Sequence, residues 1–365
     1  MAIRLTRLPE HIDIPAILVT VLIGAAGGFA ARAAHLPLPM LLGSMLSVAA
    51  LALGHVRVKG REVTFPPALR LGFLPVLGVA IGGSFSPSVL RDMPTWWPSV
   101  LAVFLFVPLA HFLSYTAVSR VGSLDKVTAF FGSAPGGLVE TVQMGEERGA
   151  NVAMLTMLQF LRLIVTVVLV PIAFTVMTGH AVGSASGASL SHAALTLHDL
   201  PWLIAAGIVG AVLGKLSRLP AGLIAGPLLM SSAIHAMGIV EGGPPQWMIN
   251  LGQIAIGTSL GVRFKGVARK DFTHALRLAA VSTGVSLTLA SIFALIFSSI
   301  VDKPAAAVFL AFAPGGLTEM SLIALSLNMS VVYVTAHHLV RIVMAVVMAQ
   351  VLARRILGPW EVGGE

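Results

Sequence analysis

The sequence predicts an all-α polytopic membrane protein built from two inverted repeats, each with five spanning helices plus one re-entrant or broken helix that carries a Pro-Gly-Gly (PGG) motif. Three observations predict this fold. Hydrophobic residues make up 56% of the 365 residues and charged residues only 10%, against roughly 25% in soluble domains. The mean hydropathy is +0.93, and apolar segments near span length recur along the whole chain. Finally, the second half of the sequence repeats the first.

The predicted segments follow one another without a long polar domain. In the first half they cover residues 14–34, 38–54, 71–90, 97–119, 127–144 and 151–178. A Ser-, Gly- and His-rich stretch follows, and the second half has segments at 200–216, 221–240, 246–262, 274–300, 304–326 and 331–353. The chain therefore divides into membrane repeat 1 (14–178), an extracytoplasmic linker (179–199) and membrane repeat 2 (200–357).

The two halves align element by element. "HLPLPMLLGSML" at 35–46 matches "RLPAGLIAGPLL" at 218–229, a shift of 183 residues. "GVAIGGSF" at 78–85 matches "GTSLGVRF" at 257–264, a shift of 179, so the intervening connector is four residues longer in the first half. The shift of 179 continues to the end of the repeat, which indicates an internal duplication.

The positive charges decide how the segments cross the membrane. If all twelve segments span, Lys and Arg divide eleven against ten between the two sides, without the bias expected of cytoplasmic loops. If each PGG segment instead returns to the side it came from, 18 fall inside and three, Arg32, Arg91 and Lys303, fall outside. This arrangement has ten spans and both termini in the cytoplasm. Five spans per repeat is an odd number, so the repeats are inverted, as in many secondary transporters.

The PGG motifs stand at equivalent places in the two repeats, as "SAPGGLVE" (133–140) and "FAPGGLTE" (312–319). Proline removes a backbone donor, and two glycines allow the chain to leave helical geometry. Inside a membrane such a break is tolerated only where protein or a watery cavity covers it, and the exposed helix ends can hold an ion or a charged solute. A kink packed between helices is the alternative. We expect a binding site near the membrane midplane at Pro135, Gly136, Gly137, Pro314, Gly315 and Gly316.

Charged residues accompany both motifs. Glu140 and Glu319 stand five residues after the prolines, and a carboxylate within a membrane costs about 2.5–3.5 kcal/mol on insertion scales, so it needs a partner or a task. The task is either binding Na⁺ or H⁺, or neutralising the start of the following helix. Arg162 and Arg341 lie 22 residues after each Glu, and either pair with that Glu or bind an anionic solute. His338, which aligns with Gln159, is a candidate for proton transfer.

Other classes of function are disfavoured. The net charge of +8 fits positively charged cytoplasmic loops better than nucleic-acid binding, because no basic segment is interleaved with aromatic residues. No Cys is present and the eleven His are scattered, so we expect no catalytic residues, no metal site and no cofactor beyond a coupling Na⁺ or H⁺. The expected partners are the lipid bilayer and a small-molecule solute, and glycine-lined helix faces permit a homodimer.

With its duplicated APGG-x₂-E element and its distal arginines, the chain resembles the AbrB family of bacterial membrane proteins over roughly residues 14–355. Members of that family are labelled ammonia monooxygenases or regulators of gene expression. The resemblance implies a multi-pass protein of the bacterial inner membrane. Together with the pattern of the residues it leads us to expect a secondary transporter of a small, anionic organic solute that is not an enzyme. The alternative is a membrane sensor that regulates gene expression through a ligand or partner without transport.

Overall fold

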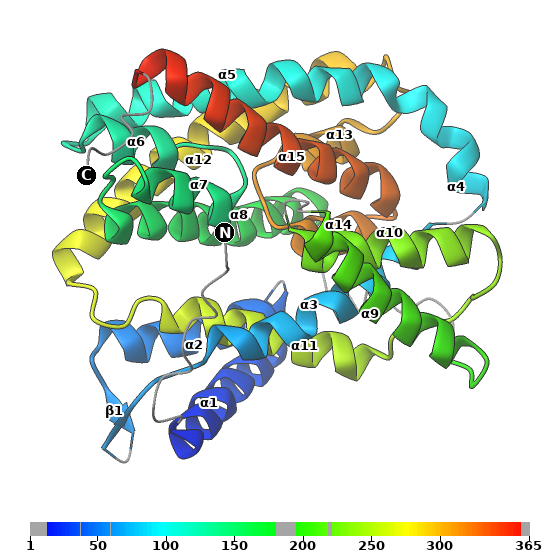
Figure 1. Ribbon diagram of the computed structural model, residues 1–365, viewed down its shortest axis with the longest axis horizontal. Coiled ribbons are helices and arrows are strands. Elements are labelled where there is room, and N and C mark those ends of the chain that lie inside the picture. Colours follow the sequence, from blue (N-terminus) through cyan, green and yellow to red (C-terminus); the bar gives the residue numbers. More distant parts are fainter. Residues whose placement is uncertain are drawn as a thin grey trace.

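The computed structural model describes residues 13–36, 38–58, 60–85, 87–179, 195–217 and 221–358, which are mostly helical (Figure 1). A short antiparallel hairpin of β1 (Arg57–Val58) and β2 (Arg61–Glu62) interrupts the helices. Most of the predicted linker, at 180–194, lies outside the described residues. The all-α fold expected from the sequence is confirmed.

Six of the described helices are long and apolar enough to cross a membrane. They are α1 (Ile14–Ala33), α5 (Trp97–Val121) with the 3₁₀ turn η1 (Met93–Trp96) before it, α8 (Val152–Thr178), α9 (Asp199–Leu216), α12 (Arg269–Phe297) and α15 (Val331–Ile356). The other four predicted spans are α2 (Pro39–Leu53), α3 (Pro67–Gly82), α10 (Gly222–Ala236) and α11 (Gln246–Val262). Their 15 to 17 residues rise roughly 22–26 Å at about 1.5 Å each, less than the roughly 30 Å of a hydrocarbon core. The count of ten spans therefore stays a prediction.

The first three helices of each repeat form one layer, which we call the short-helix layer (lower part and right-hand side of Figure 1). Its packing order is α1, α2, α11, α3, α10, α9, so the two repeats interleave at its centre. Close packing between neighbours depends on glycine. A Cβ at Gly27 would come within 2.5 Å of the Gly43 carbonyl oxygen, and one at Gly210 within 2.6 Å of the Pro227 backbone. These two pairs join α1 to α2 and α9 to α10.

The remaining helices form a second layer, the broken-helix layer. It contains α5, α8, α12 and α15 together with the half-helices α6 (Lys126–Gly132), α7 (Leu138–Glu146), α13 (Ala305–Phe312) and α14 (Leu317–Ser326). The helix α4 (Pro87–Asp92) and η1 connect the first layer to the second. One large apolar cluster joins the layers, with Leu41 and Leu77 from the first and Phe106 and Phe312 from the second.

Exchanging the two repeats leaves the packing pattern unchanged. In the short-helix layer the exchange reverses the packing order. In the broken-helix layer α8 packs on α12 as α15 packs on α5, and α7 packs on α15 as α14 packs on α8. Helix capping follows the same rule, because Asn151 and Ser330, 179 residues apart, cap α8 and α15 with their side chains.

Each broken helix returns to the end of the molecule from which it started. The Asn151 N–H donates to Thr128 Oγ1 at 2.8 Å, which ties the start of α8 to the start of α6. In the second repeat, Trp96 packs edge-on against Tyr333 in the first turn of α15, with ring centroids 5.3 Å apart. The Lys303 ammonium, just before α13, lies 5.9 Å from the Trp96 ring centroid.

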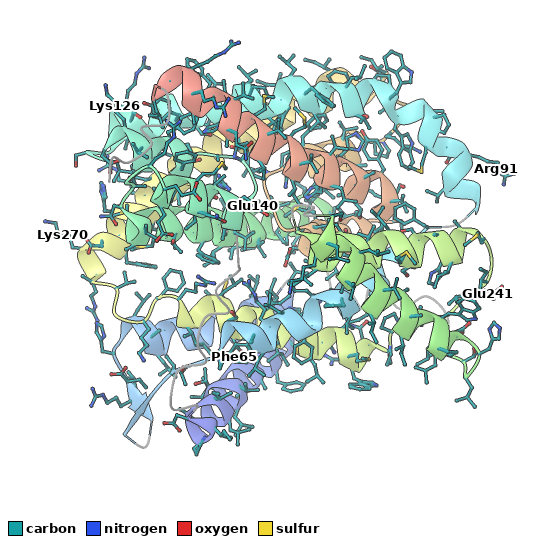
Figure 2. The ribbon with its side chains drawn as sticks, in the orientation of Figure 1. Phe65, Arg91, Lys126, Glu140, Glu241 and Lys270 are labelled. Carbon is teal, nitrogen blue, oxygen red and sulfur yellow. The ribbon has the colours of Figure 1, made fainter. Side chains whose placement is uncertain are left out.

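These contacts also show that the two broken helices start at opposite ends of α5, because Trp96 precedes α5 whereas α6 follows it. Figure 2 shows Lys126 and Lys270 at one end of the molecule and Arg91 at the other. This separation is the one that the distribution of positive charge requires.

Candidate functional site

The two breaks separate pairs of half-helices within the broken-helix layer. Residues 133–137 join α6 to α7, and residues 313–316 join α13 to α14, with Pro135 and Pro314 both buried. The backbones differ in detail. Gly137 caps α7 in the left-handed region, at φ 65°, whereas Gly316 caps α14 in an extended conformation, at φ −72°. A residue with a Cβ would be strained at the first position, so glycine is needed there.

Arg162 binds the open end of the first half-helix. Its guanidinium donates to the Ala134 carbonyl oxygen and, at 2.7 Å, to Gln159 Oε1. Gln159 Nε2 in turn donates to the Phe131 carbonyl at 2.6 Å. The arginine and the glutamine thus satisfy carbonyls that α6 leaves without intrahelical partners, where the helix dipole is negative.

Arg341 does the same for the second half-helix. It donates to the Ala313 carbonyl and, at 2.9 Å, to the Gly315 carbonyl. A further bond of 3.3 Å joins its guanidinium to His338 Nδ1, and His338 Nε2 contacts the Leu310 carbonyl at 2.9 Å. Two of the acceptor carbonyls lie 179 residues from their counterparts, Ala134 to Ala313 and Phe131 to Leu310, whereas the bond to Gly315 belongs to the second repeat alone. The internal duplication therefore extends to individual hydrogen bonds.

The contacts of His338 fix its tautomer. A carbonyl oxygen only accepts, so Nε2 carries the proton, and Nδ1 must then accept from Arg341. This neutral imidazole presents one donor and one acceptor, as the Gln159 amide does in the first repeat. Protonation would place an N–H against the guanidinium. The geometry therefore favours a positioning role for His338 over the predicted proton transfer.

Glu140 and Glu319 occupy the third position of α7 and α14, in the first turn, where the helix dipole is positive. Glu319 is buried, at 7% exposure, and a Cβ at Gly316 would overlap its carboxylate. Glu140 is half-buried, and its Oε2 lies 3.7 Å from the Cβ position of Gly137. The arginines bind carbonyls and the Gln159 and His338 side chains rather than these carboxylates, so the predicted Arg–Glu pairing within each repeat is not observed.

The two breaks meet at the centre of the layer. A Cβ at Gly136 would lie 3.1 Å from the Ala345 Cβ and 4.0 Å from the Arg341 carbonyl oxygen, so the first break packs on the arginine helix of the second repeat. Conversely, α14 packs on α8. The first break is thus bound by Arg162 and packed on the helix that carries Arg341. The second break is bound by Arg341, and α14, which follows it, packs on the helix that carries Arg162. Sequence reasoning missed the acceptor carbonyls, because a backbone group has no sequence signature.

The described residues hold no group of three or more His, Asp or Glu side chains that could ligate a metal ion. His337, beside His338, contacts the Tyr333 carbonyl at 2.8 Å and Ser99 Oγ at 2.9 Å, away from the arginine. Of the predicted binding residues, the structure brings each arginine together with the break of its own repeat, and it places each glutamate in the first turn of the helix after the break.

A family profile described as "Transition state regulatory protein AbrB" matches residues 51–357, which is most of the chain. The protein belongs to the AbrB family. It is 24% identical over 335 residues to "Putative regulator AbrB" of Escherichia coli (strain K12), covering 89% of this chain and 91% of that protein. It is also 24% identical over 347 residues to "Uncharacterized protein YhjN" of Bacillus subtilis (strain 168), covering 89% of each chain. The AbrB profile includes both breaks, both glutamates and both arginines.

Proposed function

We propose that this AbrB-family protein is a secondary transporter, which moves a small organic anion across the bacterial inner membrane by alternating access. The observation that carries the proposal is the convergence of two duplicated break–arginine units that start from opposite ends of α5. Discontinuous helices that meet at the midplane from opposite sides are the recurrent binding site of transporters with inverted repeats.

We propose that the two repeats are inverted. The packing pattern is preserved when the repeats are exchanged, and the exchange turns a broken helix that starts at one end into one that starts at the other. Two repeats related by a pseudo-two-fold axis can exchange conformations, and this exchange converts a state open to one side into a state open to the other. The separate short-helix layer supplies the surface against which the broken-helix layer would move.

The site residues divide into a support and a binding group. Arg162, Arg341, Gln159 and His338 hold the open ends of the first half-helices. Glu140 and Glu319, at the positive ends of the second half-helices, are our candidates for binding the coupling H⁺ or Na⁺. Arg341 Nε is buried without a hydrogen-bond partner among the described residues, which leaves one donor for the solute.

The alternative is a membrane sensor that binds the same ligand without moving it. The name of the Escherichia coli relative, which says regulator, favours this alternative. A sensor needs access to its site from only one side of the membrane. As expected from the sequence, we do not propose an enzyme.

Access from both sides can be measured without knowing the solute. The chain has no Cys, so Leu138→Cys, at the half-buried start of α7, introduces a single thiol beside the break. In proteoliposomes of known orientation, a membrane-impermeant maleimide should label this thiol from either side. Lys126→Cys and Glu241→Cys, exposed at opposite ends of the molecule (Figure 2), are the matched one-sided controls. Labelling of Leu138→Cys from one side only would favour the sensor.

A further inference from the structure

Two arginines outside the broken-helix layer have no acidic partner. Arg70 lies in the first turn of α3 and is half-buried, and its buried Nε has no hydrogen-bond partner among the described residues. Arg263 caps the C-terminus of α11 and remains accessible to solvent. Neither forms an ion pair within the described part of the chain. Both belong to the short-helix layer.

The two arginines lie at the same end of the packed helices α3 and α11. Glu62, shortly before α3, binds Lys265, two residues after Arg263, at 2.8 Å, which ties the start of α3 to the end of α11. The nearest carboxylate in the adjoining loops is already engaged. Glu62 binds Lys265 at 2.8 Å and Arg57 at 3.1 Å, and Lys265 foremost holds the pKa of Glu62 below its usual value. Two like charges in a partly desolvated place repel each other, so this arrangement favours a bound anion.

The arginine pair faces the other layer. The Arg263 guanidinium lies 4.6 Å from the centroid of the Phe160 ring on α8. Phe160 stands beside Gln159 and two residues before Arg162, so the pair lies between the layers and adjoins the helix that supports the first break. A guanidinium that stacks on an aromatic ring keeps its N–H groups free to donate in the plane of the guanidinium. Two of these N–H groups match the paired oxygens of a carboxylate or phosphate.

The duplication shows that this feature belongs to one end only. At the shift of 179, Arg263 aligns with Ser84, Arg70 with Ile249 and Phe160 with Leu339. The second repeat thus has an apolar residue where the first has Arg70, and the first repeat has a serine where the second has Arg263. The symmetry of the scaffold does not require these arginines. The excess of Lys and Arg expected in cytoplasmic loops accounts for their presence at one end only, so the asymmetry assigns the pair to the predicted cytoplasmic end.

We propose that Arg70 and Arg263 bind the carboxylate or phosphate group of a small anionic solute at the entrance between the two layers. The proposal rests on the transporter function and adds to it the substrate class and the end of the molecule at which the solute first binds. The site accommodates a dianionic group better than a monoanion, because two guanidinium groups share it.

The test is thermal unfolding of the purified full-length protein in detergent with succinate, citrate or inorganic phosphate, and with chloride at matched ionic strength. We expect at least one of the three multivalent anions to raise the unfolding temperature with a saturable dependence. The apparent Kd should rise at least about tenfold in Arg70→Gln and in Arg263→Gln. Arg277→Gln, which removes an exposed arginine on α12, is the matched control and should leave Kd unchanged.

The unfolding temperature measured without added anion separates a role of the arginines in anion binding from a role in the stability of the fold. Each Gln variant removes a like-charge repulsion, so its unfolding temperature without added anion should equal or exceed that of the unaltered protein. Arg70→Lys, which keeps the charge, should retain part of the affinity. A fall in stability of both Gln variants, with unchanged Kd, would overturn the proposal.

A membrane headgroup carries the same phosphate chemistry, so a second arm adds phosphatidylglycerol or phosphatidylcholine to the detergent. Stabilisation by phosphatidylglycerol alone, with none by the three soluble anions, would overturn the proposal in favour of a lipid site. The result is independent of the two-sided labelling of Leu138→Cys. Labelling from both sides, with anion binding unchanged in the Arg70 and Arg263 variants, would support the transporter and reject this site. Labelling from one side only, with anion binding weakened in both variants, would support the site and reject transport.

Discussion

At the scale of single residues, the main finding is that the two buried arginines bind backbone carbonyls at the broken ends of α6 and α13. The sequence places these guanidinium groups near the breaks, by their equal spacing from Glu140 and Glu319. It leaves open what they bind. The structure assigns them to helix ends, where a planar fork can satisfy several carbonyls at once.

The equivalence of His338 and Gln159 predicts which substitution is tolerated. In His338→Gln, the amide can donate to the Leu310 carbonyl and accept from Arg341. The free energy of unfolding should therefore change by less than about 1 kcal/mol. His338→Leu leaves the buried Leu310 carbonyl without its side-chain donor, which should lower the free energy of unfolding by about 1–3 kcal/mol. Arg341 loses one acceptor and keeps its bonds to the Ala313 and Gly315 carbonyls. The measurement is thermal unfolding in detergent. Equal stability losses in the two variants would contradict the equivalence.

The sequence predicts which side chains accompany the breaks, but not which groups they bind. The internal alignment pairs Gln159 with His338, but it does not show that both side chains bind a carbonyl of the preceding half-helix and the arginine of their own repeat. That task became apparent only from the carbonyls of Phe131 and Leu310, because which carbonyls a break frees depends on backbone dihedrals that a sequence does not state.

At the scale of elements, the two breaks combine a proline, a glycine cap and a first-turn glutamate. The motif "APGG" predicted the breaks correctly, since proline and paired glycines act on the backbone locally. It did not predict that the breaks would differ. Gly137 is left-handed and Gly316 extended, so two identical tripeptides cap their helices in different conformations under different tertiary contacts.

The contact between Gly316 and Glu319 predicts a selective effect of a methyl group. In Gly316→Ala, the new Cβ overlaps the Glu319 carboxylate and must displace it. We expect a loss of any stabilisation by Na⁺ or by low pH, together with a lower unfolding temperature. The measurement is a thermal-shift titration with NaCl, with matched KCl as the ionic-strength control, and across pH 5–8.

Gly284→Ala is the matched control, because Gly284 lies in α12 with open space around its Cβ position. Alanine there should be neutral or stabilise by up to about 1 kcal/mol through helix propensity. An unaltered Na⁺ and pH response in Gly316→Ala, equal to that of Gly284→Ala, would exclude Glu319 from ion binding.

At the scale of the whole molecule, the helices form two layers in which the repeats interleave. The duplication and the charge distribution predict paired, oppositely oriented halves, and this stays a prediction. The structure shows that the two broken helices start at opposite ends of α5. The layers themselves could not be predicted, because which helices pack together depends on surfaces far apart in sequence, such as Gly257 of α11 against the Leu41 carbonyl of α2.

The proposed coupling predicts that both carboxylates are needed. Glu140→Gln and Glu319→Gln each neutralise one carboxylate, and each variant alone should abolish coupled flux of organic anions in proteoliposomes. The reason is that alternating access uses the sites of both repeats in each cycle. Solid-supported membrane electrophysiology would measure the current after a jump in anion concentration. A sensor would lose its ligand response in one of the two variants and carry no current in the unaltered protein.

Movement of the broken-helix layer against the short-helix layer is the central claim, and distances between the layers test it most directly. Because the chain lacks Cys, spin labels can be placed at Lys126 and at Arg57 of β1 toward one end, and at Glu241 and Ala305 toward the other (Figures 1 and 2). Double electron–electron resonance in nanodiscs should give two distances for each pair. The populations should shift in opposite directions at the two ends when Na⁺, pH or anion is varied. One narrow distance at both ends under every condition would contradict alternating access.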